Sequence, residues 1–192
     1  MLKYIKILCI LSLLTFMSCS EETADVQTKV RKNKIDSVRS ESTTIKRVID
    51  GDTFETDKGE RIRLLGIDTP EKFSSNKMSS DAERSGLTED EIKSLGEISS
   101  HYADSLMKGK KVFLLSDPLN DDIDRYGRLL RYIFTEDGVM YNLKIISDGF
   151  AYAYTKFPII TNKMFISAEN DARKNNRGLW SDESFKKLKE QQ

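Results

Sequence analysis

The sequence predicts one α+β domain, compatible with a small Greek-key β-barrel of the OB type. Three apolar runs separated by turn residues come first, a helical pattern precedes the fourth run, and no βαβ alternation occurs. The 192 residues include 31 basic and 31 acidic side chains, and 38% of the residues are hydrophobic. This composition is typical of one soluble domain with additions, and it excludes collagen-like, solenoid and multi-pass membrane proteins.

Residues 1–18 have the pattern of a secretory signal, because two lysines precede the apolar run 7–14. That run is too short to span a bilayer. The segment ends Phe16-Met17-Ser18-Cys19, which resembles a bacterial lipobox with Phe16 where leucine is usual. We therefore expect a lipid on Cys19 that anchors the chain in a membrane of the cell envelope or surface, outside the cytoplasm. The alternatives are a plain signal peptide and an uncleaved anchor.

The residues after Cys19, up to position 43, are predicted to form a flexible tether. They contain no aromatic residue and cannot bury enough apolar surface to fold alone. A flexible coil of roughly 24 residues spans about 25 to 30 Å, enough to hold a small domain clear of a membrane. Removal of residues 1–18 deletes two of the 31 basic side chains and no acid, so the remaining net charge is about −2. Net charge alone therefore does not indicate nucleic-acid binding.

Five strands are expected from apolar runs bounded by turn residues. Three short antiparallel strands are predicted between residues 44 and 67, and two more over residues 112–115 and 129–134. The turns predicted between and after these strands contain Asp50-Gly51, Gly59 and Asp137-Gly138.

Three helices are expected from helical spacing. Ile98, Tyr102 and Leu106 share one face at i, i+4 and i+8, and Gly109 is well placed to end that helix. A second helix is predicted over residues 142–149. The third carries Met164, Ala168 and Ala172.

The remaining segments lack such patterns. Residues 73–96 are rich in serine and charge, and we interpret them as a long surface loop with a helical turn at 88–95. The folded domain is expected to span residues 44–181, and residues 182–192 are expected to form a charged tail.

Scarce histidine and cysteine limit the chemistry. His101 is the only histidine, so mechanisms that need two imidazoles have no residues to use. Cys9 and Cys19 are the only cysteines, and they cannot form a zinc finger, an iron–sulfur site or a CxxC pair.

Four carboxylates bracket one predicted hairpin: Asp50 and Asp52 before it, and Asp68 and Glu71 after it. Such oxygen clusters suit calcium or magnesium, whereas zinc would be expected to recruit histidine or cysteine. Each aspartate taken alone has a structural explanation, because Asp-Gly is a common turn and Asp-Thr-Pro a common strand exit.

Two arginines are expected beside this acidic group. Arg63 lies on the strand that leads to Asp68, and Arg128 ends the segment Asp124-Arg125-Tyr126-Gly127-Arg128. Paired guanidinium groups beside a metal suit a phosphodiester, which gathers negative charge on its oxygens as water attacks. The alternative for each arginine alone is a surface salt bridge.

Taken together and in order, these segments resemble the staphylococcal nuclease family. The resemblance covers residues 44–181 and implies a five-stranded OB barrel with three helices. It further implies a calcium-dependent endonuclease that acts on DNA and RNA with little sugar specificity. Such enzymes cleave the bond to the 5′-oxygen and leave 3′-phosphate ends. The matching segments are residues 48–53, 61–71 and 124–128, and Arg177-Gly178-Leu179-Trp180 near the end.

The resemblance assigns a ligand role to three residues. Asp52 and Asp68 would bind one calcium ion through their carboxylates, and Thr69 through its backbone carbonyl. Asp50 would lie next to the ligands without binding the ion.

The resemblance also assigns catalytic roles. Arg63 and Arg128 would clamp the scissile phosphate, and Glu71 would orient or deprotonate the attacking water.

Three further residues would contact the substrate by the same resemblance. Tyr126 would bind a terminal phosphate, with Arg125 where the family often has lysine. Tyr154 is the residue we favour for stacking a base, which would also favour single strands. The competing aromatic residues are Phe150, Tyr152 and Phe157.

Two departures from the family are the long 73–96 segment and the slightly acidic charge, which predicts a shallow salt dependence. The other functions considered are a nucleic-acid-binding OB module without catalysis and a surface adhesion or structural lipoprotein. No pattern implies a protein partner, so we expect a monomer.

Overall fold

A computed structural model of the chain describes residues 40–190. The predicted signal segment 1–18, the lipid attachment at Cys19 and most of the predicted tether lie outside the described residues. Among the helices within residues 40–190, none is long and apolar enough to cross a membrane.

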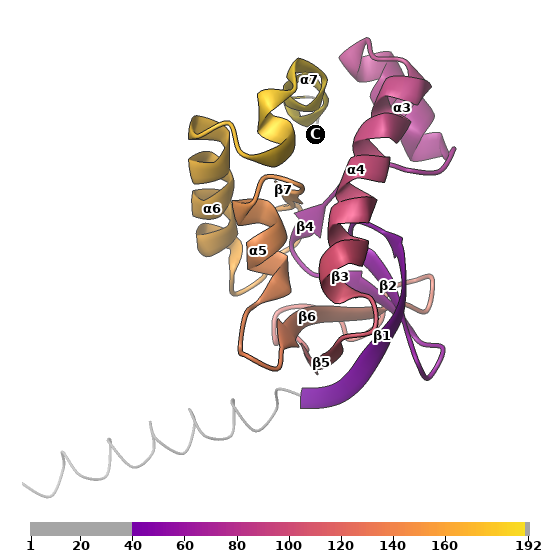
Figure 1. The fold of residues 1–192 in the computed structure, drawn as a ribbon, viewed down its shortest axis with the longest axis vertical. Helices are drawn as coiled ribbons and strands as arrows, with labels where there is room; N and C mark the ends of the chain where they lie inside the picture. Colours follow the sequence, from indigo (N-terminus) through magenta and orange to yellow (C-terminus); the bar gives the residue numbers. More distant parts are fainter. Residues whose placement is uncertain (1–39, 191–192) are drawn as a thin grey trace, which may run out of the picture. The chain divides into compact units, whose positions relative to one another are not determined.

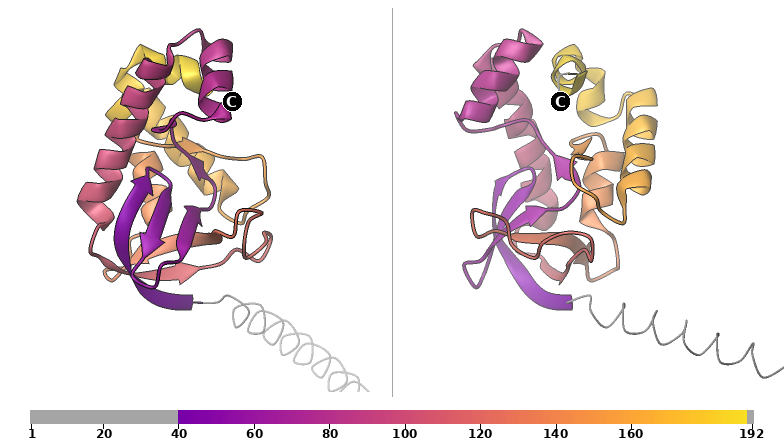
Figure 2. Two further views of the ribbon diagram at one scale, coloured as in Figure 1. Left: turned by 90° about the vertical axis from the view of Figure 1, so that its right-hand side faces the viewer. Right: turned by 180° about the vertical axis from the view of Figure 1, so that it is seen from behind.

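The predicted five-stranded barrel is confirmed (Figures 1 and 2). All neighbouring strands are antiparallel except β3 and β6, which are parallel. The barrel closes through β1, whose first half pairs with β5 and whose second half pairs with β2. Register shifts in the second half let this strand bend around the core. In barrel order the strands are β1 (Ser40–Asp50), β2 (Thr53–Thr56), β3 (Arg61–Leu64), β6 (Leu129–Thr135) and β5 (Lys111–Leu115).

Strand β1 begins at Ser40, four residues before the predicted start of the domain. Residues 40–44 pair with Leu115 to Lys111 of β5. The sequence Ser-Glu-Ser-Thr-Thr has no apolar pattern that would predict a strand. This part is a strand because its backbone pairs with β5 across the barrel. The predicted tether therefore ends before residue 40.

The described residues contain five α-helices, where the sequence predicted three. A short two-stranded sheet pairs β4 (Ile67–Asp68) with β7 (Tyr152–Ala153). The helices are α3 (Asn76–Ser85), α4 (Glu89–Met107), α5 (Tyr141–Ser147), α6 (Asn162–Lys174) and α7 (Glu183–Glu190), with a 3₁₀ turn at Gly178–Ser181.

The prediction of a long surface loop over residues 73–96 was wrong, because α3 and the start of α4 occupy most of it. The helical turn expected at 88–95 does form, as the start of α4. The Ser75 side chain accepts a hydrogen bond from the Met78 amide and starts α3, and Gly86 ends it with a φ of 70°. Thr88 and Glu91 form a capping box at the start of α4. Capping residues, rather than apolar periodicity, therefore define both ends of α3 and the start of α4.

The face that Ile98, Tyr102 and Leu106 share lies at the edge of the packed side of α4. Ile98 is 42% exposed, while Tyr102 and Leu106 are partly buried and pack against the barrel core. The residues of α4 that are buried in that core are Ala103 and Met107. Its earlier buried residues, including Ile92 and Leu95, belong to a second apolar cluster. One helix therefore joins the two cores.

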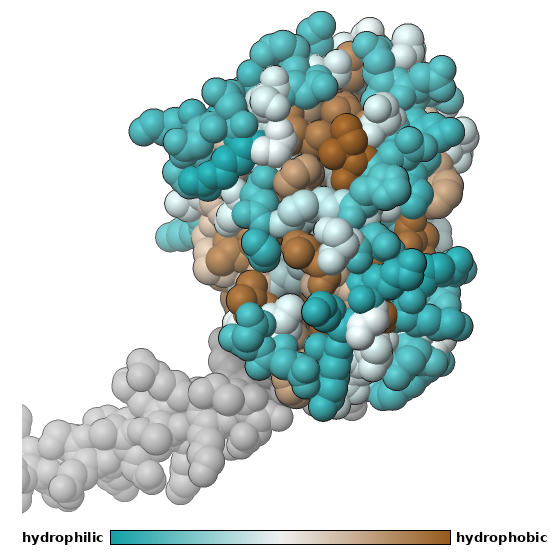
Figure 3. All heavy atoms as spheres, in the orientation of Figure 1, coloured by the Kyte–Doolittle hydropathy of each residue, from teal (hydrophilic) through white to brown (hydrophobic). Residues whose placement is uncertain are grey.

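The second cluster includes the C-terminal segment that we expected to be a charged tail. Phe185 and Leu188 of α7 are buried. The Phe185 ring stacks on Tyr152 of β7, with ring centroids 4.4 Å apart, and Trp180 packs edge-on against Tyr152. Because β7 pairs with β4, these contacts support the strand that carries Asp68. Figure 3 shows apolar side chains of one face as separate patches among polar ones.

Candidate active site

A cleft of about 940 Å³ is lined by the ends of β2 and β3, by β4 and α3, and by residues from segments 120–128 and 154–159. The structure brings eight of the nine predicted site residues to this cleft. They are Asp52, Arg63, Asp68, Glu71, Arg125, Tyr126, Arg128 and Tyr154.

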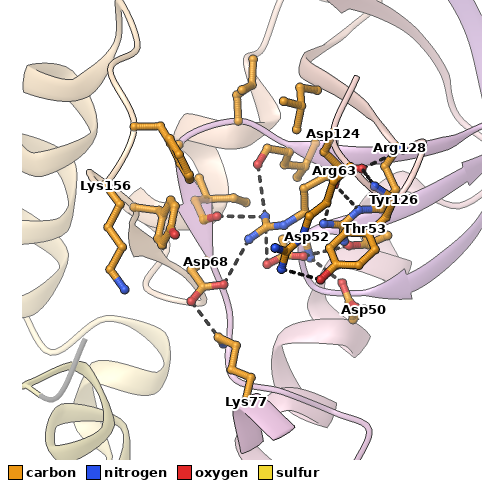
Figure 4. A pocket seen from close by; sticks show the side chains of 18 of the residues that line it. Asp50, Asp52, Thr53, Arg63, Asp68, Lys77, Asp124, Tyr126, Arg128 and Lys156 are labelled. Atoms are coloured by element: carbon orange, nitrogen blue, oxygen red, sulfur yellow. Dashed lines mark hydrogen bonds and ion pairs between the residues drawn. The ribbon is translucent and has the colours of Figure 1, made fainter. Parts of the chain in front are cut away.

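Arg63 joins the two carboxylates that were predicted to bind a metal (Figure 4). One guanidinium nitrogen lies 3.0 Å from Asp52 Oδ2, and the other donates to Asp68 Oδ1 over 3.1 Å. The first nitrogen also donates to the carbonyl of Ile67 over 2.9 Å. Burial alone would lower the pKa of Arg63, but the charges of Asp52 and Asp68 raise it above its ordinary value.

A tight connection between β3 and β4 places Arg63 opposite Asp68. Gly66 in this connection has a φ of 70°, and a Cβ atom there would lie 2.2 Å from Ile159. The buried Asn142 side chain donates to the Leu65 carbonyl over 2.9 Å and fixes the same connection. The two strands therefore turn sharply and keep their charged ends together.

Asp52 is held in place by its neighbours. Its Oδ1 accepts a hydrogen bond from the Thr53 hydroxyl over 3.0 Å, and its Oδ2 accepts one from the Thr69 hydroxyl over 3.3 Å. Thr69 is buried behind Asp52 and is the one predicted site residue that does not line the cleft. Asp50 accepts from the Asp52 amide, and burial together with the charge of Asp52 raises the pKa of Asp50 to about 8.

The donor atoms fit a hard cation, because the side chains that would bind it offer only carboxylate oxygens. Burial raises the pKa of Asp68 above its ordinary value, although Lys77 and Arg63 act against that shift. Within residues 40–190, no group of three or more Asp, Glu, His or Cys side chains is arranged to hold an ion. A calcium ion between Asp52 and Asp68 would therefore need backbone carbonyls and water to complete its ligands.

Glu71 lies beside Asp68 and shares a cation with it. The Lys77 ammonium nitrogen lies 3.0 Å from Glu71 Oε1 and 3.2 Å from Asp68 Oδ2. The other oxygen, Glu71 Oε2, accepts a long hydrogen bond of 3.4 Å from the Ser75 hydroxyl. Lys77 and Ser75 both belong to the segment at the start of α3.

Arg128 lies on the same cleft and is held by Asp124. Asp124 Oδ2 accepts from Arg128 Nε over 2.7 Å, and Asp124 Oδ1 accepts from the backbone amides of Tyr126 and Arg128. Gly127, with a φ of 77°, lets the chain fold back on itself between these residues. The segment 124–128 is therefore a turn that presents Arg128 and Tyr126 side by side.

The aromatic residues considered for substrate binding fall into two groups, those that line the cleft and those that pack elsewhere. Tyr126 is 68% exposed, and the guanidinium of Arg125 lies 4.8 Å from its ring. Tyr154 and the exposed Phe157 line the cleft with ring centroids 6.0 Å apart. Two competing candidates have other roles, because Tyr152 is buried and Phe150 stacks on Tyr102.

The model of the family described as "Staphylococcal nuclease homologue" matches residues 61–182 of this chain. The chain belongs to the staphylococcal nuclease family. The matched span contains Arg63, Asp68, Glu71 and Arg128, whereas Asp52 precedes it.

Several curated relatives of this staphylococcal nuclease family member are named as nucleases. The chain is 33% identical to a thermonuclease of Staphylococcus intermedius over 147 residues, which cover 74% of this chain and 78% of that protein. It is 33% identical to an uncharacterized endonuclease of Escherichia coli O157:H7, over 71% of this chain and 74% of that protein. Endonuclease YhcR of Bacillus subtilis strain 168 is 28% identical over 72% of this chain, which corresponds to 11% of that longer protein.

Two side chains of this staphylococcal nuclease family member were not predicted to act in the site. Lys77 lies in the segment that we expected to be a loop, and its ammonium contacts Asp68 and Glu71 only because α3 forms. Asp124 was part of the recognised segment but had no assigned role. Its position four residues before Arg128, across a glycine turn, was the available signal for the pair.

Proposed function

We propose that this staphylococcal nuclease family member is a calcium-dependent endonuclease that hydrolyses phosphodiester bonds of DNA and RNA with little sugar specificity. The observation that carries the proposal is Arg63 held between Asp52 and Asp68 in a cleft that also contains Arg128. Family membership and the printed names of the relatives, thermonuclease and endonuclease, support it.

The cleft suits a charged polymer with exposed bases. Arg63 and Arg128 offer planar donors for the non-bridging oxygens of a phosphodiester. Tyr154 and Phe157 offer aromatic faces on which any base can stack, which favours single strands. Arg125 and Tyr126 at the edge of the cleft suit a terminal phosphate.

Asp52, Asp68 and the Thr69 carbonyl would hold the ion, which supplies a positive charge that polarises the phosphate and its attacking water. Glu71 accepts a proton from that water as the oxygen attacks phosphorus and the bond to the 5′-oxygen breaks. Arg63 and Arg128 neutralise the charge that develops on the phosphoryl oxygens. The departing 5′-oxygen takes a proton from solvent water, to which Glu71 returns the proton that it accepted, and the other product keeps a 3′-phosphate.

We further propose secretion across the inner membrane and lipid attachment at Cys19. The support is the sequence pattern of residues 1–19 alone, because these residues lie outside the described part of the structure. A site with few protein ligands suits such a location, since extracellular calcium modules function with affinities of about 10⁻⁴ to 10⁻³ M. Replacement of Cys19 by serine should abolish incorporation of a labelled fatty acid in cells.

The test of the nuclease is cleavage of single-stranded DNA, duplex DNA and RNA by the purified protein with calcium, with magnesium and with EDTA. Arg63→Ala and Glu71→Ala should each lose about 10³-fold or more in kcat. Lys93→Ala is the control, because Lys93 is exposed on α4 and does not line the cleft.

We expect calcium-dependent cutting of all three substrates and 3′-phosphate products. Binding without cutting would instead support a nucleic-acid-binding module that lacks catalysis. A protein that neither binds nor cuts the three substrates would reject both the nuclease and the binding module.

A further inference from the structure

Lys77 has the reverse of the usual lysine arrangement. Its side chain is 39% exposed, yet its ammonium nitrogen is buried. Surface lysines normally bury the aliphatic stem and keep the charged group in water. Here the stem is on the outside and the charge points into the acidic site, where Figure 4 shows it directed at Asp68.

Carboxylates are the reason for this arrangement. The ammonium nitrogen lies 3.2 Å from Asp68, 3.0 Å from Glu71 and 3.6 Å from Asp81. A lysine ammonium carries its charge at neutral pH, and three carboxylates around it favour that charged form. Lys77 is therefore a built-in counter-ion of the acidic site.

Helix α3 fixes Lys77 in this position. Met78, the next residue, is buried in the second apolar cluster, and Ser75 caps the helix. Asp81, one turn later on the same face, is buried and also pairs with Arg84 over 2.5 Å. The contact thus depends on a packed and capped helix rather than on a free surface side chain.

The ion pair between Lys77 and Asp68 occupies an oxygen of a proposed calcium ligand. Of the two Asp68 oxygens, one faces Arg63 and the other faces Lys77. A divalent ion bound to Asp68 would lie close to the ammonium, and the two positive charges would repel each other strongly in a buried site.

We propose that Lys77 is a tethered competitor of the metal ion. It neutralises Asp68 and Glu71 in the metal-free protein and must leave Asp68 when calcium binds. This competition lowers the affinity of the site for calcium and so raises the free calcium concentration at which the site fills. This inference rests on the calcium site of the proposed function.

The test is calorimetric titration of the metal-free protein with calcium chloride. Lys77→Met removes the charge, and we expect it to tighten calcium binding by about tenfold or more. Lys77→Arg keeps a cation and should bind calcium within about threefold of the wild type. Lys93→Met, with the same loss of charge on α4 outside the cleft, should bind as the wild type does.

Thermal unfolding gives a second readout that does not depend on activity. In EDTA, Lys77→Met should melt below the wild type, because Asp68 and Glu71 lose their counter-ion. Calcium should then raise its melting temperature by more than that of the wild type. If Lys77→Met is not folded by circular dichroism, Lys77→Gln, which keeps a hydrogen-bond donor, takes its place with the same expectations.

Unchanged or weaker calcium binding by the folded, uncharged variant would overturn the inference while leaving the calcium site in place. Absence of calcium binding in wild type and variants alike would reject the calcium site itself, and the inference with it. The two failures are therefore distinguishable.

Discussion

Asp124 determines where the guanidinium of Arg128 lies. Both Nε and a terminal nitrogen of Arg128 lie 2.7 Å from Asp124 Oδ2. In Asp124→Asn the negative charge is lost and an NH₂ donor can face the guanidinium donors. Arg128 should therefore leave its position. We expect kcat to fall about 10- to 100-fold with little change in KM, because Arg128 acts mainly on the developing charge. Steady-state kinetics on a single-stranded oligonucleotide measures both.

The matched control is Asp121→Asn, which makes the same change of charge at an exposed position of the same cleft. Its kcat should stay within about twofold of the wild type. An equal loss in both variants would mean that cleft charge, rather than the position of Arg128, is responsible.

The same aspartate predicts a pH dependence of stability. Burial alone would raise the pKa of Asp124, but hydrogen bonds from Arg128 and Tyr126 and the charge of Arg128 hold it below its ordinary value. Its stabilisation is therefore present above the unfolded-state pKa of about 3.9 and is lost as the pH falls through the lower folded-state pKa. The difference in unfolding free energy between wild type and Asp124→Asn should shrink as the pH is lowered below about 4.

Urea unfolding at a series of pH values measures this difference. Ser94→Ala, which removes no titratable group, is the control, and its difference in unfolding free energy from the wild type should not change over the same range. If the difference in unfolding free energy between the wild type and Asp124→Asn did not change with pH, the contacts of Asp124 with Arg128 and Tyr126 would not be lowering its pKa.

At the scale of elements, α4 and the segment after β4 pass unusually close to each other. A Cβ atom on Gly96 would lie 2.5 Å from the Glu71 carbonyl oxygen. In an exposed helix, Gly→Ala stabilises by about 1 kcal/mol. Here Gly96→Ala should instead destabilise by about 1 to 3 kcal/mol, as overpacking does, and lower kcat by moving Glu71.

Chemical unfolding and cleavage kinetics together check this prediction. Ser94→Ala, at an exposed position of the same helix, should change stability by no more than about 0.5 kcal/mol and leave kcat unchanged. A stabilised Gly96→Ala enzyme with full activity would show that Glu71 tolerates the displacement.

The elements differ in how far the sequence could predict them. Strand β3 buries every second residue, Ile62 and Leu64, so its pattern was visible. Helix α3 buries only Met78 and Asp81 among its ten residues, so it has almost no apolar periodicity. Its signals were the cap residues, which the serine-rich composition of the segment obscured.

The candidate site shows the same division. Arg63 and Asp68 were predicted because their residue types and their order along the chain suggest phosphate and metal chemistry. The contact of Lys77 with Asp68 could not be predicted, because it depends on a helix that packs through Met78. Residue types that mark phosphate or metal chemistry were visible in the sequence, whereas a contact that depends on how a helix packs was not.

At the scale of the whole molecule, the cleft has almost balanced charge. The described residues that line it include seven acidic and six basic side chains. The acidic side chains are Asp50, Asp52, Asp68, Glu71, Asp81, Asp121 and Asp124, and the basic ones are Arg63, Lys77, Arg84, Arg125, Arg128 and Lys156. Four of the basic side chains, Arg63, Lys77, Arg84 and Arg128, form ion pairs with these acids.

Within the described part of the chain, Arg125 and Lys156 line the cleft without an ion pair and are available to phosphates. Each contact with a single strand adds about −0.7 to the slope of log affinity against log salt, so two contacts predict a slope of about −1.4. Binding of a fluorescent single-stranded oligonucleotide in EDTA, at several salt concentrations, measures it. Lys156→Ala should reduce the slope by about 0.7, and Lys93→Ala should leave it unchanged. A slope near −2.8 would mean that Arg63 and Arg128 also leave their ion pairs for the strand in the absence of metal, and a slope near −4 that all six cations contact it.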